Sequence, residues 1–209
     1  MAAEAPRRTR QDVLRDFRTE QILEAARRVI GKTGYAEASM ERIAEEAGVA
    51  RSTVYVYFQS KEEILHRCFA LGRRQLAERI DEALAGAAGS EARLVAVVAS
   101  VLAHVDGSRP FFWAVNSLTE AGAAAELAGL AQDVRDRLAA LLREGVEAGD
   151  LPVHDVRRSN AVLGVMIQGA VALRMREERP GAAPAAAAEL IRFFLRGVAA
   201  AADPVAEPA

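Results

Sequence analysis

The sequence predicts an all-α fold. Hydrophobic residues make up 51% of its 209 residues, yet alanine supplies much of that share and only 5% of the chain is aromatic. Alanine is the strongest helix former, and the long alternating runs of β-branched residues typical of strands are absent. Apolar residues instead recur with helical spacing in about nine segments, separated by Gly, Pro and short polar breaks.

Composition and charge narrow the class of protein. The formal net charge of −2 gives no global attraction to nucleic acid, although clustering of basic residues on one face matters more than the total. A single cysteine, Cys68, excludes an internal disulfide and fits a reducing compartment. There is no apolar signal segment and no apolar run of about 18 residues, so we expect a cytoplasmic protein that does not cross a membrane.

The N-terminal part of the chain changes character near residue 18. Residues 1–17 are polar and rich in arginine, which predicts a disordered basic arm that orders against phosphates. From Arg18 the helical period begins, with Thr19 as a candidate N-cap. Gly34 is positioned to end this helix, since glycine accepts the backbone conformation found at helix ends.

Two short helices are predicted next. Ser39 can cap the first through its hydroxyl, and Gly48 can make the tight turn that ends it. The second covers about residues 51–57, with Val54 and Phe58 facing inward and hydroxyl, tyrosine and arginine side chains on its other sides. A short helix, a glycine turn and a second polar helix indicate a helix-turn-helix.

The rest of the chain is predicted to be helical. Ser60 can cap a long connector helix that runs to about Ala85. Later helices are expected over about residues 94–106, 109–116, 127–148, 156–176 and 185–201. The expected organisation is a helix-turn-helix domain at 18–65, a larger body at 66–203 and a frayed tail at 204–209.

The helix predicted at 156–176 is apolar nearly all round from Ala161 to Leu173. Such a helix must be packed against other elements on most sides, and a chain of this size has few helices available to do so. A second copy of the chain, packed against this helix and the aromatic-bearing helix at 185–201, would supply the missing cover. The alternative is that both helices only complete a core within one chain.

A spaced motif over roughly residues 18–65 closely resembles the DNA-binding domain of the TetR family of bacterial transcriptional regulators. The matching pattern is Gly34-Tyr35-x-x-x-Ser39-Met40-x-x-Ile43-Ala44-x-x-Ala47-Gly48-Val49-x-x-x-Thr53-Val54-Tyr55-x-Tyr57-Phe58-x-Ser60-Lys61-Glu62-x-Ile64-Leu65. Three positions depart from the usual family residues: Ala50 stands where Ser or Thr caps the recognition helix, Ser52 where Gly is common, and Val56 where a large polar or aromatic residue is common. These three departures bear on which DNA sequence is recognised, whereas the motif itself is retained.

The helix at 51–57 is expected to enter the major groove of DNA, which admits a helix and displays a distinct pattern for each base pair. Arg51 is the candidate for a bidentate contact to guanine, its alternative being a solvated surface charge. For Tyr55 and Tyr57 the alternative is core packing. The residues expected to contact DNA are Ser39, Arg42, Arg51, Ser52, Thr53, Tyr55, Tyr57 and Lys61.

The resemblance also implies a small-molecule effector bound within the helical body. We expect a hydrophobic or amphipathic effector, because the body offers few polar groups. The aromatic residues at 111–113 are consecutive and cannot all face one way, so core packing is the alternative for each. The candidate effector-binding residues are His104, Phe111, Phe112, Trp113, Asn116, Met166 and Gln168.

No pattern of catalytic residues is present. The three histidines, His66, His104 and His154, lie far apart and lack metal-ligand spacing, and no nucleophile elbow or phosphate loop occurs. We therefore expect no enzyme, metal or cofactor.

The expected function is a homodimeric, sequence-specific DNA-binding regulator. It would most simply be a repressor that a small ligand releases from a palindromic operator. The alternatives are an activator, or an architectural or ligand-independent DNA-binding protein, whose nonspecific binding should collapse as salt rises.

Overall fold

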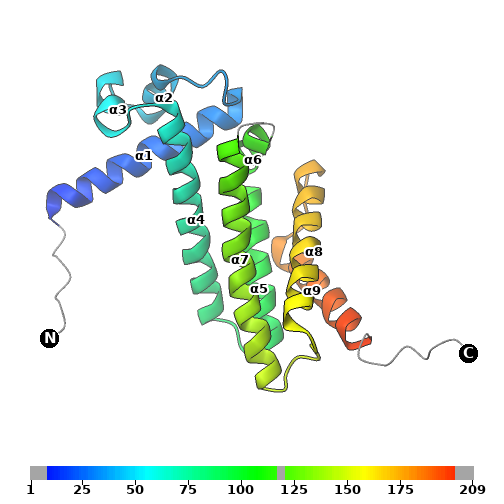
Figure 1. The fold of residues 1–209 in the computed structure, drawn as a ribbon. Helices are drawn as coiled ribbons and strands as arrows, with labels where there is room; N and C mark the ends of the chain where they lie inside the picture. Colours follow the sequence, from blue (N-terminus) through cyan, green and yellow to red (C-terminus); the bar gives the residue numbers. More distant parts are fainter. Residues whose placement is uncertain (1–8, 117–120, 201–209) are drawn as a thin grey trace, which may run out of the picture. The chain divides into compact units, whose positions relative to one another are not determined.

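The computed structural model describes residues 9–116 and 121–200. Within these ranges it contains nine helices and no strand (Figure 1), as the sequence predicts. The helices are α1 (Arg10–Thr33), α2 (Met40–Ala47), α3 (Arg51–Tyr57), α4 (Lys61–Ala85), α5 (Ser90–Gly107), α6 (Arg109–Asn116), α7 (Ala121–Glu147), α8 (Val156–Arg176) and α9 (Ala183–Ala200).

The chain divides into two compact units that share α4. The first runs to Gly72 and includes Pro110–Ala123, so it contains α1, α2, α3, the first half of α4 and most of α6. The second comprises Arg73–Arg109 and the chain from Ala124 onward, and so contains α5, most of α7, α8 and α9.

Helix α1 begins at Arg10, so the prediction that residues 1–17 form a disordered arm is wrong from Arg10 onward. The cause is a capping box: Thr9 Oγ1 accepts from the Asp12 N–H at 3.2 Å, and the Asp12 carboxylate accepts from the Thr9 N–H at 2.9 Å. Thr19 is no cap, because it lies inside the helix and its hydroxyl donates to the Arg15 carbonyl. Residues 1–8 lie outside the described part of the chain.

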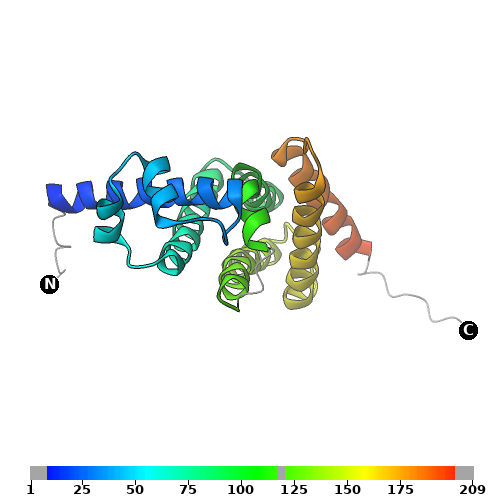
Figure 2. The same cartoon turned by 90° about the horizontal axis from the view of Figure 1, so that it is seen from above.

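The first unit is built around the C-terminal half of α1. Ile22, Ala26 and Ile30 are fully buried there, and α2 packs directly against α1 (Figure 2). Glu46 of α2 joins the two helices at the surface, accepting from Arg28 Nε at 2.7 Å and from Lys32 Nζ at 3.0 Å. The apolar contact and the two ion pairs together fix α2 on α1.

Helix α6 packs into the same unit through one aromatic ring. Phe111 meets Phe69 of α4 edge to face, with ring centroids 5.6 Å apart, and the Arg27 guanidinium lies 5.4 Å from the centre of the Phe111 ring. Gly31 makes this approach possible, because a Cβ there would lie 2.8 Å from Pro110 Cβ.

The single cysteine is a core residue of this unit. Cys68 is buried, and its thiol lies 3.5 Å from the Leu23 carbonyl oxygen, to which it donates. Burial raises the pKa of the Cys68 thiol to about 12. The side chain therefore behaves as a small apolar group.

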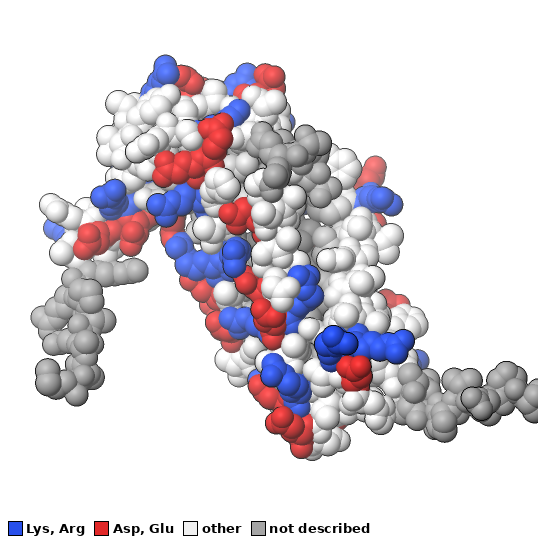
Figure 3. Space-filling view, viewed as in Figure 1, with Lys and Arg blue, Asp and Glu red and all other residues white. Residues whose placement is uncertain are grey.

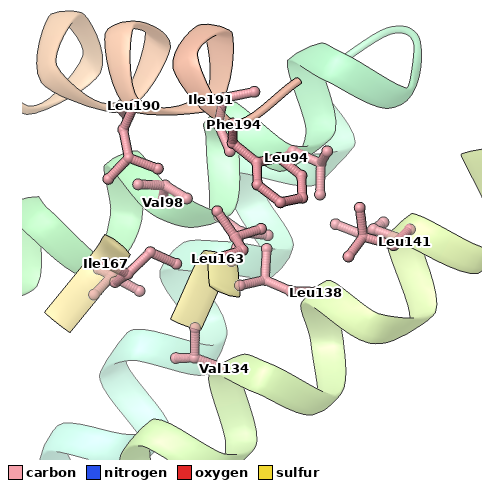
Figure 4. Packing of buried hydrophobic residues seen from close by; sticks show 14 of the residues in the cluster. Leu94, Val98, Val134, Leu138, Leu141, Leu163, Ile167, Leu190, Ile191 and Phe194 are labelled. Atoms are coloured by element: carbon pink, nitrogen blue, oxygen red, sulfur yellow. The ribbon is translucent and has the colours of Figure 1, made fainter. Parts of the chain in front are cut away.

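The second unit has a continuous apolar core built by the second half of α4 together with α5, α7, α8 and α9; Figure 4 shows part of it. Its fully buried members include Leu94 and Leu102 of α5, Leu138 of α7, Leu163 of α8 and Ile191 of α9. Helix α5 contacts α9 most extensively and α8 less so. Helix α7 begins at Ala121, several residues before the start that its apolar stripe predicted.

A buried ion pair holds the C-terminal end of α8. Arg174 is almost fully buried and binds the carboxylate of Asp106 of α5 through Nε and Nη2. Its Nη2 also donates to the Gly181 carbonyl at 2.8 Å, in the segment between α8 and α9. Because each added hydrogen bond offsets the cost of burying the guanidinium, this arrangement fixes the α8–α9 connection against α5.

Helix α8 has two apolar faces, and only one is buried. Leu163 and Ile167 point into the core, whereas Val162, Val165 and Leu173 are exposed on the opposite side. On α9, Phe193 is exposed in the same way. Taken singly, no described helix combines the length and apolarity needed to cross a bilayer.

Candidate nucleic-acid interface

The turn between α2 and α3 is fixed by local chemistry. Ser39 Oγ accepts from the Arg42 N–H at 3.3 Å and caps α2, as predicted. Gly48 ends α2 in the left-handed conformation, with φ 65°, also as predicted. The side chain of Gln21 in α1 donates to the Ala47 carbonyl at 2.7 Å, so the last turn of α2 is also held from α1.

Helix α3 is attached to the first unit by two buried residues, and its other side chains, both polar and apolar, are largely exposed to solvent. Val54 and the following Phe58 are buried, as predicted. Tyr55 is exposed, and Val56 is the most exposed large apolar residue of the described chain, at 74%. Ala50 stands at the N-cap with no side-chain hydrogen bond, and the helix still begins at Arg51.

Arg51 is held by residues of both helices. Its Nη2 lies 2.7 Å from the Glu41 Oε1 of α2 and 3.4 Å from the Tyr55 hydroxyl. The guanidinium carbon is 5.5 Å from the centre of the Tyr55 ring. Hydrogen bonding to Tyr55 and then the charge of Glu41 raise the pKa of Arg51. Arg51 is therefore an exposed cation with a defined orientation rather than a loose surface charge.

Glu41 is the acidic counterpart of this site. A hydrogen bond from its own backbone N–H lowers the pKa of Glu41 most, followed by the Ser39 hydroxyl and the charge of Arg51. The carboxylate is therefore ionised at neutral pH.

Lys61 is the first residue of α4, and its side chain contacts Tyr35. Its Nζ donates to the Tyr35 carbonyl at 2.9 Å and to the Ala36 carbonyl at 3.2 Å. The ammonium also lies 4.4 Å from the centre of the buried Tyr35 ring, whose hydroxyl donates to Glu62. The side chain is half-buried, which places a positive charge at the first residue of α4.

The remaining candidate residues differ in exposure. Arg42 and Ser52 are exposed, and Arg42 donates to the Glu37 carbonyl at 3.2 Å. Ser39, Thr53 and Tyr57 are half-buried. All eight candidates lie in α2, in α3, or at the start of these helices or of α4, so the structure brings them into one unit.

Acidic and basic side chains are interspersed on one face of the molecule. Figure 3 shows Lys and Arg interspersed with Asp and Glu on the face that it presents, rather than gathered into one basic patch. Affinity for DNA would therefore depend on individually placed residues more than on a broad positive field.

The candidate effector residues are divided between the two units. Phe111, Phe112 and Trp113 belong to the first, where Phe111 is buried against Phe69, Phe112 is half-buried and Trp113 is 63% exposed. Phe111 therefore has the core-packing role that was considered as the alternative to effector binding. Trp113 points into solvent, since the neighbouring ring takes the inward position.

The other candidates lie in the second unit. His104 is buried in α5, and Met166 of α8 is half-buried against the apolar core. Gln168 is exposed on α8 and does not face that core, because the buried stripe of α8 passes through Ile167. The side chain of Asn116 lies outside the described residues. Among the described residues, no group of three His, Cys, Asp or Glu could hold a metal ion.

Two residues that hold the candidate DNA-contacting side chains were not among the predicted site residues. Glu41 pairs with Arg51, and Tyr35 supports Lys61. The only sequence signal for Tyr35 was its place in the spaced motif, and Glu41 looked like an ordinary acidic residue of a first helical turn.

A capped helix, a left-handed glycine turn and an exposed polar second helix define a helix-turn-helix DNA-binding protein. Residues 22–68 match the family model described as "Bacterial regulatory proteins, tetR family". The first unit of this chain therefore carries a DNA-binding domain of the TetR type.

Related proteins agree with this assignment. A 78-residue segment is 38% identical to the fatty acid metabolism regulator protein of Bacillus subtilis, and the match covers 37% of this chain and 40% of that protein. The HTH-type transcriptional regulator SrpR of Pseudomonas putida is 29% identical over 154 residues, or 72% of this chain and 71% of that protein. The chain thus spans less than half the length of the Bacillus relative. Both relatives are named as regulators.

The fold is also found in solved structures. FadR of Bacillus subtilis, in complex with stearoyl-CoA, matches with a TM-score of 0.73 at 23% identity, over 85% of this chain and 98% of that one. The TetR-family regulator PfmR of Thermus thermophilus matches with a TM-score of 0.65 at 26% identity, over 84% and 97%. The likeness extends beyond the helix-turn-helix to most of the helical body.

Proposed function

We propose that this protein is a sequence-specific repressor that binds a palindromic operator as a homodimer. The observation that carries the proposal is the exposed face of α3, where an oriented arginine, a tyrosine phenol and an apolar side chain project together. A major groove accepts a helix of this kind, and Arg51 is suited to guanine O6 and N7. The other candidates, from Ser39 to Lys61, would contact phosphates and set the register.

A second copy is needed because one short helix offers few base contacts. The exposed apolar faces of α8 and α9 support such a pairing, since Val165 and Leu173 would otherwise remain in water. Two copies related by a two-fold axis would present two α3 helices to two half-sites.

The test is selection of DNA by the purified full-length protein from a randomised pool, followed by footprinting. A palindromic consensus is expected, with affinity for it that persists at salt concentrations that abolish binding to unrelated DNA. Arg51→Ala should weaken binding to the selected site by about 10- to 100-fold per half-site. A protein that enriches no sequence would be an architectural DNA-binding protein instead.

Repression can be separated from activation in a reporter strain. A promoter that carries the selected site should become more active when the protein is removed. A fall in promoter activity would make the protein an activator.

We further propose a fatty acyl-CoA as the first effector to test. The motivation is the stearoyl-CoA bound in the Bacillus subtilis FadR structure and the name of the fatty acid metabolism regulator, together with the expected hydrophobic or amphipathic ligand. Adding stearoyl-CoA should release the protein from its selected DNA, whereas coenzyme A alone should not. Release by both compounds equally would place the recognition in the nucleotide part, and release by neither would exclude this class of effector.

A further inference from the structure

The recognition helix carries one cation, and that cation is paired within the protein. The sequence of α3, RSTVYVY, contains only Arg51 as a charged residue. Its Nη2 is 2.7 Å from Glu41 Oε1, although the two side chains are 60% and 51% exposed. The acidic partner comes from the other helix of the motif, so the pair spans the surface expected to meet DNA.

The geometry restrains the guanidinium without using up its donors. Glu41 and Tyr55 both contact Nη2, and the Tyr55 ring lies beneath the group. A guanidinium has five N–H donors in a rigid planar fork. Nε and Nη1 keep their three N–H donors. Both two-pronged edges of the group include Nη2, so a bidentate contact to guanine uses the Nη2 N–H that the long 3.4 Å contact with the Tyr55 hydroxyl holds only weakly.

The charge of Glu41 has a second effect. An arginine in a groove binds any nearby phosphate, which adds affinity without sequence preference. A carboxylate 2.7 Å away offsets that attraction and is itself repelled by phosphate. Bringing Glu41 close to DNA costs free energy because phosphates repel its carboxylate. Only a base that offers Arg51 two well-placed hydrogen-bond acceptors offsets that cost.

We propose that Glu41 is a specificity-determining residue that holds Arg51 for a guanine contact and suppresses its binding to phosphate. This inference rests on the proposed function, since it assigns a role within sequence-specific DNA binding. Glu41 is a positioning residue that acts through Arg51.

The test compares wild type, Glu41→Gln, Arg51→Ala and the double variant. The probes are a duplex that the wild-type protein selected from a randomised pool and an unrelated duplex of the same length. Dissociation constants for both are measured over a series of KCl concentrations. Glu45→Gln is the matched control, because it removes the same charge from an exposed position one turn along α2.

Glu41→Gln should bind the unrelated duplex about tenfold more tightly, while affinity for the selected duplex changes far less, so the ratio of the two falls. The salt dependence of binding to the unrelated duplex should steepen by about two units in a dimer, one for each released arginine. In the Arg51→Ala background, Glu41→Gln should leave the ratio unchanged. Glu45→Gln should retain the wild-type ratio.

If Glu41→Gln changed the affinity for both duplexes equally, and Glu45→Gln did the same, Glu41 would act only as a general surface charge. That result would overturn the inference. A change of base preference in the Arg51→Ala background would also overturn it, because Glu41 would then contact a base directly. Wild-type protein that selects no site would refute the proposed function itself, which is a different result. Circular dichroism of each variant shows whether α2 and α3 remain folded.

Discussion

Gly145 of α7 and Leu151 of the following loop are in direct contact. A Cβ on Gly145 would lie 2.6 Å from Leu151 Cγ and 3.0 Å from Ser90 Cβ. The backbone holds them together, since the Leu151 N–H donates to the Gly145 carbonyl at 3.1 Å. Leu151 is buried in the core of the second unit, so it has little room to withdraw.

Gly145→Ala should therefore destabilise the protein despite the better helix propensity of alanine. Overpacking costs about 1–3 kcal/mol and the propensity gain is about 1 kcal/mol, which leaves a net loss of up to about 2 kcal/mol. Thermal or urea unfolding measures it. Gly129→Ala in the same helix is the control, because its Cβ would meet only the flexible end of Arg73 and should stabilise. Equal effects of the two changes would refute the packing argument.

Ala50→Ser should stabilise α3. Ala50 has the extended backbone of an N-cap but no side-chain oxygen, and a serine there can accept from an amide of the first turn. The expected gain is about 0.5–1 kcal/mol, seen as slower hydrogen exchange of the α3 amides. Ala50→Val, which lacks the oxygen, should give no gain. Equal protection in both variants would show that capping is not the cause.

Charges on the exposed face of α8 should prevent dimerisation. The double variant Val165→Lys and Leu173→Lys places two ammonium groups where apolar side chains are 67% and 62% exposed in the single chain. Burying them against a second copy would be costly, so light scattering should report a monomer. Leu14→Lys places the same charge on an exposed apolar position of α1, and light scattering of this variant should still report the mass of a dimer. A wild-type monomer at micromolar concentration would refute the pairing.

Acid should weaken the attachment of α2 to α1. Hydrogen bonds from Arg28 and then Lys32 lower the pKa of Glu46 below its usual 4.5. A depressed carboxyl pKa contributes stability above the unfolded value, and that contribution is lost as pH falls through the folded value. Glu46→Gln should lower the melting temperature at neutral pH and flatten its decline in acid. Glu82→Gln, which removes the same charge from α4, should follow the wild-type pH profile.

The helix-turn-helix could be predicted closely because its signals are local. Ser39 and Gly48 set the ends of α2 through bonds to residues a few positions away, and the predicted range of α3 matches the structure. The start of α1 was missed for a physical reason. Val13, Leu14 and Phe17 are exposed there, so no buried stripe marks the first turns, and only the Thr9 capping box does.

The parts that could not be predicted depend on contacts between distant segments. The pairing of Arg51 with Glu41 depends on the angle that the Gly48 turn gives to α3. The sequence predicted that the aromatic residues at 111–113 could not all face one way, and they do not. Which one turns inward was decided by Phe69 and Arg27, on two other helices.

The burial of Cys68 restricts the kinds of chemical signal to which this regulator can respond. Its sulfur is enclosed in the first unit and stays protonated under physiological conditions, so peroxides and electrophiles find no thiolate to attack. Oxidation of Cys68 is therefore not expected to act as a signal in this chain. The same property suits the protein to site-specific labelling, because a cysteine introduced on the surface would be its one reactive thiol.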